Sequence, residues 1–348
     1  MAMTIVEATR SVVGGIDTHG EIHVAAALDN IGGLLGTRSF EADPAGYKAL
    51  LAWLESFGTL AKVGVEGTGS YGAGLARFLS RAGIDVIEID RPNRQARRNA
   101  GKSDPLDAVE AARATLSGKA NGRAKSRDGW VEALRVLLVA KRSARAARVK
   151  ALTQMRQLTY SAPDQLQGRL KGLPIAEFVS AAQGLRSARS RDAMTAATKA
   201  SLCALGHRVA DLEAEIAELD TMITPIIETN AAELLRVYGV GIDAAASLLV
   251  AAGDNPERLR CEAAWAHLCG VSPLEASSGK VTRHRLNRGG DRQANRALWH
   301  IVISRLASDP DTKAYMERRL KEGRSKREVI RILKRYVARE TYRHLPRH

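Results

Sequence analysis

Cysteines are scarce in this chain, long apolar runs are missing, and acidic residues are outnumbered by basic ones. The 348 residues include three cysteines, Cys203, Cys261 and Cys269, and an odd, scattered set argues against a disulfide framework. No apolar run approaches the roughly 18 residues that cross a bilayer, and the N-terminus has no secretory signal pattern. These shortages predict a cytoplasmic protein without a membrane segment.

The two C-terminal cysteines raise the question of a metal site. Cys261, His267 and Cys269 are close in sequence, but no fourth ligand stands at a zinc-finger spacing. We therefore expect core cysteines here, since a buried thiol behaves as a small apolar side chain.

The excess of positive charge narrows the choice of partners. Lys and Arg number 53 against 38 Asp and Glu, which gives a formal net charge of +15 and a pI near 10.0. A protein this basic commonly binds a polyanion, because each neutralised phosphate releases counterions and adds affinity. We expect nucleic acid as the partner, with an acidic membrane surface as the competing one.

The first 90 residues predict alternating strands and helices. The hydrophobic content of 45% over 348 residues is enough for two or three domains. Small turns separate three apolar runs, which indicates an antiparallel meander. Helix, strand, helix and strand patterns follow, and a basic segment at 91–102 then leads to a helix at Asp104. The expected strands cover residues 12–17, 22–28, 34–40, 61–65 and 85–89.

This succession of elements is the order of the α/β ribonuclease H-like fold, and acidic residues end several of its elements. Asp17 and Glu66 each end a strand, where functional groups gather in open α/β sheets. Asp104 is a good N-cap, and Asp107 falls on the same helical face. Four converging carboxylates form the oxygen-rich environment that Mg²⁺ prefers, and two such ions serve phosphodiester chemistry. Each acid alone has a plainer explanation, as a helix cap or a solvated strand end.

A rival interpretation starts from the same first strand. Residues 15–20 also resemble the first phosphate loop of sugar-kinase and actin-like ATPases. Those enzymes need a second Asp-Gly-rich phosphate loop and an adenosine-binding glycine pair, and the sequence has neither. A net charge of +15 is also unusual for a small-molecule kinase.

Residues 130–160 have the pattern of a long helix with one apolar stripe and one basic face. This asymmetry suits a coiled coil lying on nucleic acid, and Arg142 and Arg145 are the candidate contacts. A second helical pattern at 202–227 either returns antiparallel to the first or pairs with a second protomer, and a loose helical insertion separates the two. The apolar stripe is expected at Leu134, Leu137, Leu138, Ala144, Val149, Leu152 and Met155, and the basic face at Arg135, Lys141, Arg142, Arg145, Arg148, Lys150 and Arg156.

Two features of the C-terminal third point to phosphate. Residues 235–245 have the form of a helix-hairpin-helix whose backbone N–H groups hold a phosphate, although an ordinary helix–helix turn explains them equally well. Ser277 and Ser278 precede Gly279 among cations, which fits either a nucleophile for phosphoryl transfer or a flexible phosphate-binding loop. From 313 to 348, 13 Lys and Arg against 4 Asp and Glu suggest another nucleic-acid face. The candidate contacts near the serines are Lys280, Arg283, Arg285, Arg288 and Arg292.

Several motifs, in order along nearly the whole chain, resemble the DEDD transposases of the insertion sequence 110 family. The sequence departs from the family pattern at Asp291, where members often carry Asn. The motifs are Ile16-Asp17, the run EGTGSY at 66–71, the run KSDPLDA at 102–108, Gly270-Val271-x-Pro273, Ser277-Ser278-Gly279 and the Gly-Gly-Asp-Arg step at 289–292.

The resemblance implies an enzyme that cuts and rejoins DNA strands, built from three parts. These are a RuvC-like catalytic domain at 1–122, a helical coiled-coil connector with an insertion at 123–230, and a mostly helical transposase domain at 231–348. The family's acidic tetrad falls on Asp17, Glu66, Asp104 and Asp107, which hold Mg²⁺, with Mn²⁺ able to substitute. Its nucleophilic serine falls on Ser278, with Ser277 adjacent, and forms a phosphoserine link to DNA.

The resemblance also implies partners. Members act on donor and target DNA and use a structured non-coding RNA of the element, whose pairing supplies the choice of sequence. It implies a homodimer or homotetramer that is associated with the nucleoid when active, and it leaves open whether one protomer supplies both the acids and the serine. Two other functions stay open: a RuvC-like junction endonuclease using metal-activated water, and a non-catalytic nucleic-acid-binding protein.

Overall fold

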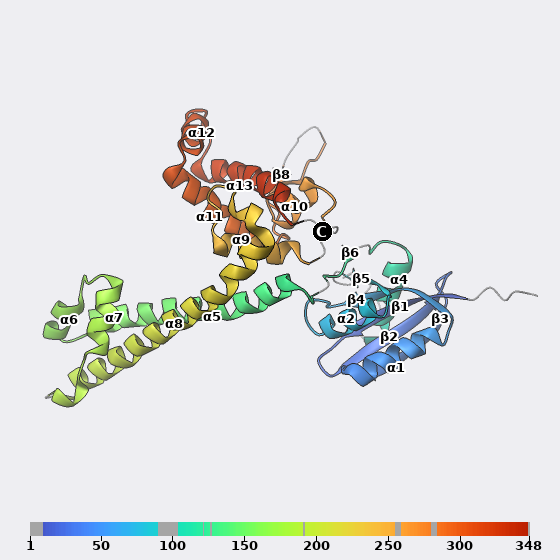
Figure 1. The fold of residues 1–348 in the computed structure, drawn as a ribbon, viewed down its shortest axis with the longest axis horizontal. Helices are drawn as coiled ribbons and strands as arrows, with labels where there is room; N and C mark the ends of the chain where they lie inside the picture. Colours follow the sequence, from blue (N-terminus) through green and yellow to red (C-terminus); the bar gives the residue numbers. More distant parts are fainter. Residues whose placement is uncertain are drawn as a thin grey trace, which may run out of the picture. The chain divides into compact units, whose positions relative to one another are not determined.

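A computed structural model describes residues 10–89, 104–120, 122–125, 127–190, 192–254, 259–279 and 284–346. These residues form two compact units (Figure 1). We call Met1–Gly129 with Gly253–Arg260 the sheet unit, and Trp130–Ala252 with Cys261–His348 the helical unit. The division into three domains at 122 and 230 stays a prediction. The basic segment at 91–102 and the candidate contacts Lys280 and Arg283 lie outside the described residues.

A mixed sheet of six strands dominates the sheet unit, in the order β3-β2-β1-β4-β5-β6. β1 pairs antiparallel with β2 and parallel with β4, and β4 pairs parallel with β5. This topology fits a ribonuclease H-like domain and confirms the predicted strand order, while the short β6 has no counterpart in the sequence prediction. The strands are β1 (Ser11–Thr18), β2 (Ile22–Asp29), β3 (Leu34–Glu41), β4 (Thr59–Glu66), β5 (Asp85–Ile89) and β6 (Gly122–Arg123).

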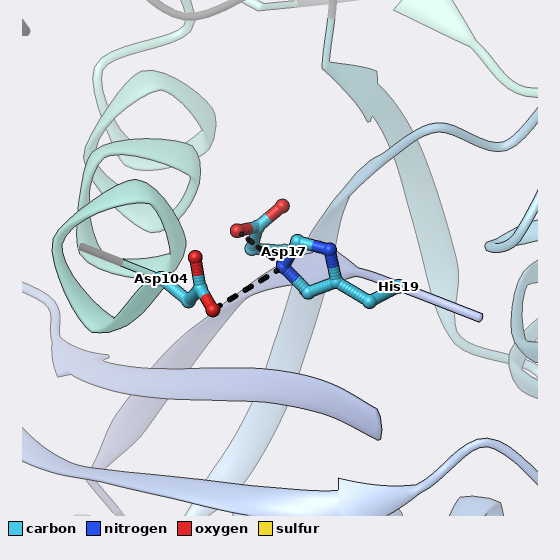
Figure 2. Close-up of side chains that lie close together, drawn as sticks. All are labelled: Asp17, His19 and Asp104. Atoms are coloured by element: carbon cyan, nitrogen blue, oxygen red, sulfur yellow. Dashed lines mark hydrogen bonds and ion pairs between the residues drawn. The ribbon is translucent and has the colours of Figure 1, made fainter. Parts of the chain in front are cut away.

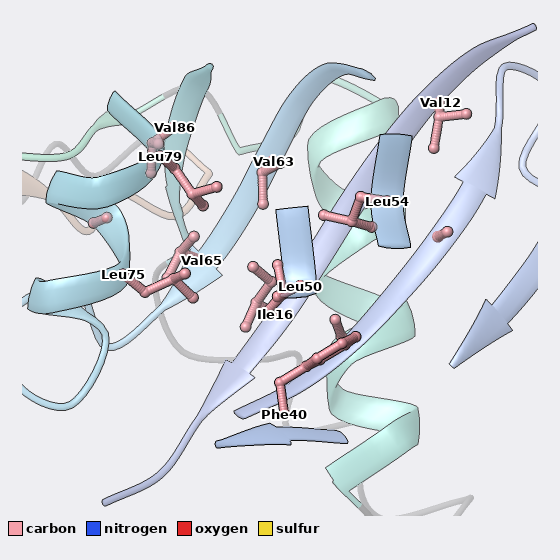
Figure 3. Packing of buried hydrophobic residues seen from close by; sticks show 13 residues of the cluster. Val12, Ile16, Phe40, Leu50, Leu54, Val63, Val65, Leu75, Leu79 and Val86 are labelled. Carbon is pink, nitrogen blue, oxygen red and sulfur yellow. The ribbon is translucent and has the colours of Figure 1, made fainter. Parts of the chain in front are cut away.

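Helices cover both faces of this sheet. On the face of α1 and α2, Ile16 and Val63 of the strands and Leu54 of α1 are fully buried in one apolar cluster (Figure 3). On the other face, α4 packs against Val24 and Ala26 of β2. The three helices are α1 (Pro44–Glu55), α2 (Ala73–Arg81) and α4 (Asp104–Leu116).

Two glycines allow α4 to lie directly on the sheet. A Cβ at Gly15 of β1 would overlap the backbone of α4 at Ala112, and a Cβ at Gly64 of β4 would overlap the side chain of Thr115. Because the strand and helix backbones touch, no larger residue fits at Gly15 without moving α4. Alternate residues of a strand share a face, so Asp17 lies on the α4 face as Gly15 does.

We predict that Gly15→Ala lowers the free energy of unfolding of the sheet unit by about 3 kcal/mol, because the added methyl group overpacks a backbone contact. Urea-induced unfolding of the full chain measures the change. Gly122→Ala is the matched control in the same sheet, since a Cβ there meets only the carbonyl oxygen of Glu88, at 3.9 Å. Equal unfolding free energies for the two variants would contradict the role assigned to Gly15.

The helical unit begins with two long helices, α5 and α8, that run antiparallel within one chain. Two ion pairs between them show this direction: Arg148 of α5 contacts Glu213 of α8, and Lys141 of α5 contacts Asp220 of α8. The earlier residue of α5 therefore pairs with the later residue of α8. The insertion between them is α6 and α7, whose apolar residues are buried with those of α5 and α8. A coiled-coil geometry for the pair stays a prediction. These elements are α5 (Trp130–Tyr160), α6 (Asp164–Leu170), α7 (Ile175–Gln183), the 3₁₀ turn Ser187–Arg189 and α8 (Ala193–Leu235).

The surface of α5 differs from its sequence prediction at two kinds of position. Val149, expected in the apolar stripe, is 60% exposed, whereas Lys141, expected on the basic face, is 1% exposed. A buried cation needs acidic partners, and Lys141 contacts Asp220 and lies 2.6 Å from Asp243. Arg145 also pairs with Asp243, at 2.7 Å. The basic face is therefore partly neutralised by acids from α8 and α9.

The C-terminal part of the helical unit is mostly helical, as expected. Trp265 is fully buried, and its indole N–H donates to Thr341 Oγ1 at 3.3 Å. The predicted hairpin is a turn between α8 and α9 in which Gly239 adopts φ +79° and packs against Ile301. Phosphate binding by this turn stays a prediction. The elements are α9 (Ile242–Ala252), α10 (Glu262–Leu268), β7 (Leu274–Glu275), β8 (His284–Arg285), α11 (Arg292–Ser308), α12 (Pro310–Lys321) and α13 (Lys326–Arg343).

The cysteines follow the prediction in part. Cys269 is buried, and burial raises the pKa of its thiol. Cys261 is exposed at the start of α10, so the core position expected for it is wrong. Within the described ranges, no helix has both the length and the apolar character needed to cross a bilayer.

Candidate metal centre and serine hairpin

Asp17 and Asp104 meet where α4 begins (Figure 2). Asp17 lies near the carboxyl end of β1, and Asp104 is the first residue of α4. His19 lies between them, with its Nε2 3.2 Å from Asp17 Oδ2 and 3.6 Å from Asp104 Oδ2. One ligand atom from each of the three residues lies within 4.8 Å of the other two. The structure thus brings together two of the acids predicted from sequence.

The other two predicted acids, Asp107 on α4 and Glu66 at the end of β4, do not join this tight group. Asp107 is one turn further along α4, is 5% exposed, and raises the pKa of Asp17 through its charge. The parallel register of β1 and β4 places Glu66 beside Asp17 on the neighbouring strand. The hydroxyl of Thr18 donates to the backbone oxygen of Glu66 at 2.8 Å and holds the two strand ends together.

The electrostatics of the site favour a bound cation. Burial raises the pKa of the Asp17 carboxyl, the charges of Asp107 and Asp104 raise it further, and His19 opposes the rise. Ionisation of Asp17 therefore costs folding free energy. Carboxylate oxygens are the ligands that hard divalent cations prefer, and a cation between these acids would remove the repulsion. The donor set therefore fits a hard divalent cation.

We predict that Asp17→Asn raises the melting temperature of the metal-free protein at neutral pH, because the amide removes the cost of ionising a carboxyl that burial and neighbouring acids disfavour. A raised pKa means that the folded state holds its proton to higher pH than the unfolded state. The penalty removed by Asn therefore exists above that pKa, and the gain should shrink as the pH falls toward about 4. Calorimetry in EDTA across this pH range measures it.

The same melting experiment with added Mg²⁺ tests whether a cation binds at these acids. Mg²⁺ should raise the melting temperature of the unmodified chain and leave Asp17→Asn nearly unchanged, because binding to the folded state alone stabilises it. Asp104→Asn should reduce the gain as well. Identical melting curves of the unmodified chain with and without Mg²⁺ would argue against a metal centre here.

The candidate nucleophile Ser278 lies between the two paired strands of a short hairpin in the helical unit, β7 and β8, which we call the serine hairpin. β7 and β8 pair antiparallel, with Leu274 opposite Arg285 and Glu275 opposite His284. Ser278 follows β7 by three residues and is exposed, as a nucleophile must be to reach a substrate. The acids thus belong to the sheet unit and the serine to the helical unit.

Glycines and an asparagine hold the base of this hairpin. A Cβ at Gly290 would overlap the backbone of Gly270, which itself adopts φ +66°. Asn295 of α11 donates to the backbone oxygen of Cys269 at 2.8 Å, and Lys334 of α13 donates to the Asn295 Oδ1, also at 2.8 Å. Two of the motifs singled out in the sequence, around residues 270 and 290, therefore contact each other.

Asp291, where the chain departs from the family pattern, caps α11. Its Oδ1 accepts hydrogen bonds from the backbone N–H groups of Gln293 and Ala294, both at 2.8 Å. A carboxylate at a helix N-terminus satisfies free N–H groups and interacts well with the helix dipole. The carboxylate thus takes the place that a phosphate would need at this helix end.

The predicted nucleic-acid contacts that the structure describes differ in their surroundings. Arg142 is half-buried and donates to Ser247 Oγ at 3.2 Å, and burial lowers the pKa of its guanidinium. Arg145 is engaged by Asp243. A role in nucleic-acid binding stays a prediction for each of them. Three others are exposed at or near the base of the hairpin, namely Arg285, Arg288 and Arg292.

Sequence reasoning missed His19. Its signal is the spacing from Asp17, because residues two apart in an extended segment share a side. The acidic motif at Asp104 gives no hint of an imidazole partner, since that contact forms only when α4 is seated on the sheet.

The mixed sheet, with acids where β1 ends and α4 begins, fits a ribonuclease H-like domain. Comparison with protein families is more specific. Residues 14–160 match the DEDD profile of IS110, described as a transposase, and residues 231–317 match the profile of the IS116/IS110/IS902 transposase family. The chain belongs to the IS110 family of transposases.

Two relatives come from insertion elements. A 43.6 kDa protein of insertion element IS110 from Streptomyces coelicolor is 29% identical over 120 residues, which are 34% of this chain and 29% of that protein. A 42 kDa protein of insertion element IS900 from Mycobacterium paratuberculosis is 25% identical over 134 residues, 38% of this chain and 34% of that protein. The chain spans about a third of the length of these curated relatives.

Proposed function

We propose that this protein is a DNA transposase, a recombinase that cuts and rejoins DNA strands to move an insertion sequence. The observation that carries the proposal is the approach of Asp104 to Asp17, on a ribonuclease H-like sheet, in a member of the IS110 family. The net charge of +15 supports DNA as the substrate, because phosphate neutralisation drives binding.

The metal in this proposal is Mg²⁺, with Mn²⁺ able to substitute. Asp17 and Asp104 would hold it directly, while Asp107 on α4 and Glu66 on the neighbouring strand β4 would complete the acidic tetrad. When bound, the cation neutralises charge on the phosphodiester that reacts. His19 is placed to orient the carboxylates of Asp17 and Asp104, since it contacts both.

The nucleophile in this proposal is the Oγ of Ser278. The Oγ forms a bond to the phosphorus of the DNA backbone as the bond to one strand oxygen breaks. The serine proton passes to solvent, and the leaving strand oxygen takes up a proton and becomes a hydroxyl. Attack by the hydroxyl of a second strand on the phosphoserine then rejoins DNA and releases the serine. Exposed cations around the hairpin, such as Arg285 and Arg288, would stabilise the charge that develops.

Choice of sequence, in this proposal, comes from a structured non-coding RNA of the element that pairs with donor and target DNA. The basic character of the chain supports such a partner. A homodimer or homotetramer would carry out the strand exchange. Sequencing the nucleic acid that copurifies with the protein tests the guide: an RNA mapping to DNA beside the gene is expected, and its consistent absence would contradict RNA guidance.

We predict that Ser278→Ala abolishes a covalent protein–DNA adduct that the unmodified chain forms with Mg²⁺ or Mn²⁺. The adduct needs the hydroxyl that this substitution removes, so trapping should fall at least about 100-fold, the scale on which a removed catalytic group acts. Denaturing gel electrophoresis of labelled DNA measures it.

Ser277→Ala is the matched control, and it should leave the adduct in place. If Ser277→Ala alone removes the adduct, the neighbouring serine is the nucleophile. DNA cleavage without any adduct, sensitive to Asp17→Ala, would instead favour the junction endonuclease that uses water. DNA binding with no reaction in any condition would favour a non-catalytic nucleic-acid-binding protein.

A further inference from the structure

A cavity of about 720 Å³ lies at the base of the serine hairpin, within the helical unit. Its walls are the loop at 270–273, the segment at 286–292 that follows β8, and one side of α13. A cavity of this size accommodates one small organic ligand and is too small for a double helix. Six of its lining residues are cations: Arg288, Arg292, Arg324, Arg331, Lys334 and Arg335.

Positive charge outweighs negative charge in this lining, where one carboxylate, Glu328, stands among the six cations. Arg335 pairs with Glu262. Hydrogen bonds from the backbone and hydroxyl of Ser325, and then the charges of Arg324 and Arg331, lower the pKa of Glu328, the carboxylate that lines the cavity. Lys334 is half-buried and has a neutral partner, Asn295, while burial and then the charge of Arg331 lower its pKa. Within the described part of the chain, the other four cations have no carboxylate within 4 Å. The cavity therefore favours an anion.

An aromatic ring and an apolar side chain share this cavity with the cations. Tyr336 is 47% exposed and Leu286 is 52% exposed, and both line the cavity. The Tyr336 ring meets Tyr315 edge-on, with ring centres 5.9 Å apart, which holds it in place. Cations beside an exposed aromatic ring are the combination that binds unpaired nucleotides, because phosphates contact the cations while the base stacks on the ring.

The position of the cavity links it to the serine. The loop at 270–273 leads directly into β7, and Leu286 directly follows β8. Ser278 lies three residues beyond β7, which is about 10 Å of extended chain. The Gly270 and Gly290 contact fixes the base of the hairpin, so the cavity and the hairpin form one local structure.

We propose that this cavity binds an unpaired nucleotide of the strand whose neighbouring phosphodiester reaches Ser278. Arg324 and Arg331 would contact the phosphates on either side of it, and Tyr336 would stack on the base. This inference rests on the proposed transposase function and deepens it, because it assigns an unpaired strand, and not a duplex, as the occupant of the hairpin base.

Fluorescence anisotropy of a labelled 12-nucleotide oligothymidylate with the full chain, in EDTA, tests the proposal. Arg331→Ala should weaken binding about tenfold and lower the salt slope by about 0.7, the value of one phosphate contact on a single strand. Arg327→Ala is the matched control, since Arg327 is exposed on the same helix and does not line the cavity. It should weaken binding less than twofold.

The stacking role has its own pair of variants. Tyr336→Ala should weaken binding at least about fivefold, and Tyr336→Phe should bind as the unmodified chain does, because stacking needs the ring and not the hydroxyl. Equal losses for Arg331→Ala and Arg327→Ala, or no loss for Tyr336→Ala in a chain with an unchanged melting temperature, would overturn the proposal.

Binding of different oligonucleotides shows whether the nucleotide belongs to RNA or DNA. It also separates failure of the cavity proposal from failure of the proposed serine chemistry. If binding of a single-stranded RNA oligomer depends on Arg331 and Tyr336, the cavity is supported with RNA as its occupant. If binding of a single-stranded DNA oligomer depends on these two residues, it is supported with DNA as its occupant. A duplex that binds as tightly as the single strand, with the same dependence of binding on Arg331 and Tyr336, overturns the proposal. Binding is measured without metal and repeated in Ser278→Ala, so it does not depend on the serine chemistry. If the unmodified chain forms no adduct but binding still depends on Arg331 and Tyr336, only the proposed serine chemistry is rejected.

Discussion

The close approach of α4 to the sheet is the contact on which the candidate metal centre depends. Gly15 and Gly64 lack the side chains that would hold the helix away, and α4 therefore lies against β1 and β4. Only in that position does Asp104, at the start of the helix, come within reach of His19 and Asp17. A packing constraint in the middle of the helix thus determines the chemistry at its end.

The hairpin that carries Ser278 also depends on a close backbone contact at glycines. Gly290 lies against the backbone of Gly270, and Asn295 bonds to the carbonyl oxygen next to that contact. Lys334 orients Asn295 from α13. Backbone contacts of this kind tolerate no side chain, which explains why two separate sequence motifs around these glycines form one structure.

Local patterns in the sequence predict much of this fold, and contacts between distant residues explain where prediction fails. The first five strands and the helix at 130–160 follow from apolar periodicity, and the acids at Asp17 and Asp104 follow from their places at element ends. Periodicity assigned Lys141 to a basic face because its partners, on helices far along the chain, leave no local signal. His19 was missed because its contact with Asp104 requires the assembled fold.

We propose that Asp17 and Asp104 share one divalent cation. Diffraction from crystals grown with Mn²⁺, recorded at the manganese absorption edge, locates such an ion directly. We expect an anomalous peak bonded to carboxylate oxygens of both Asp17 and Asp104. A map from a Mn²⁺-saturated crystal with no peak between these two residues would contradict it.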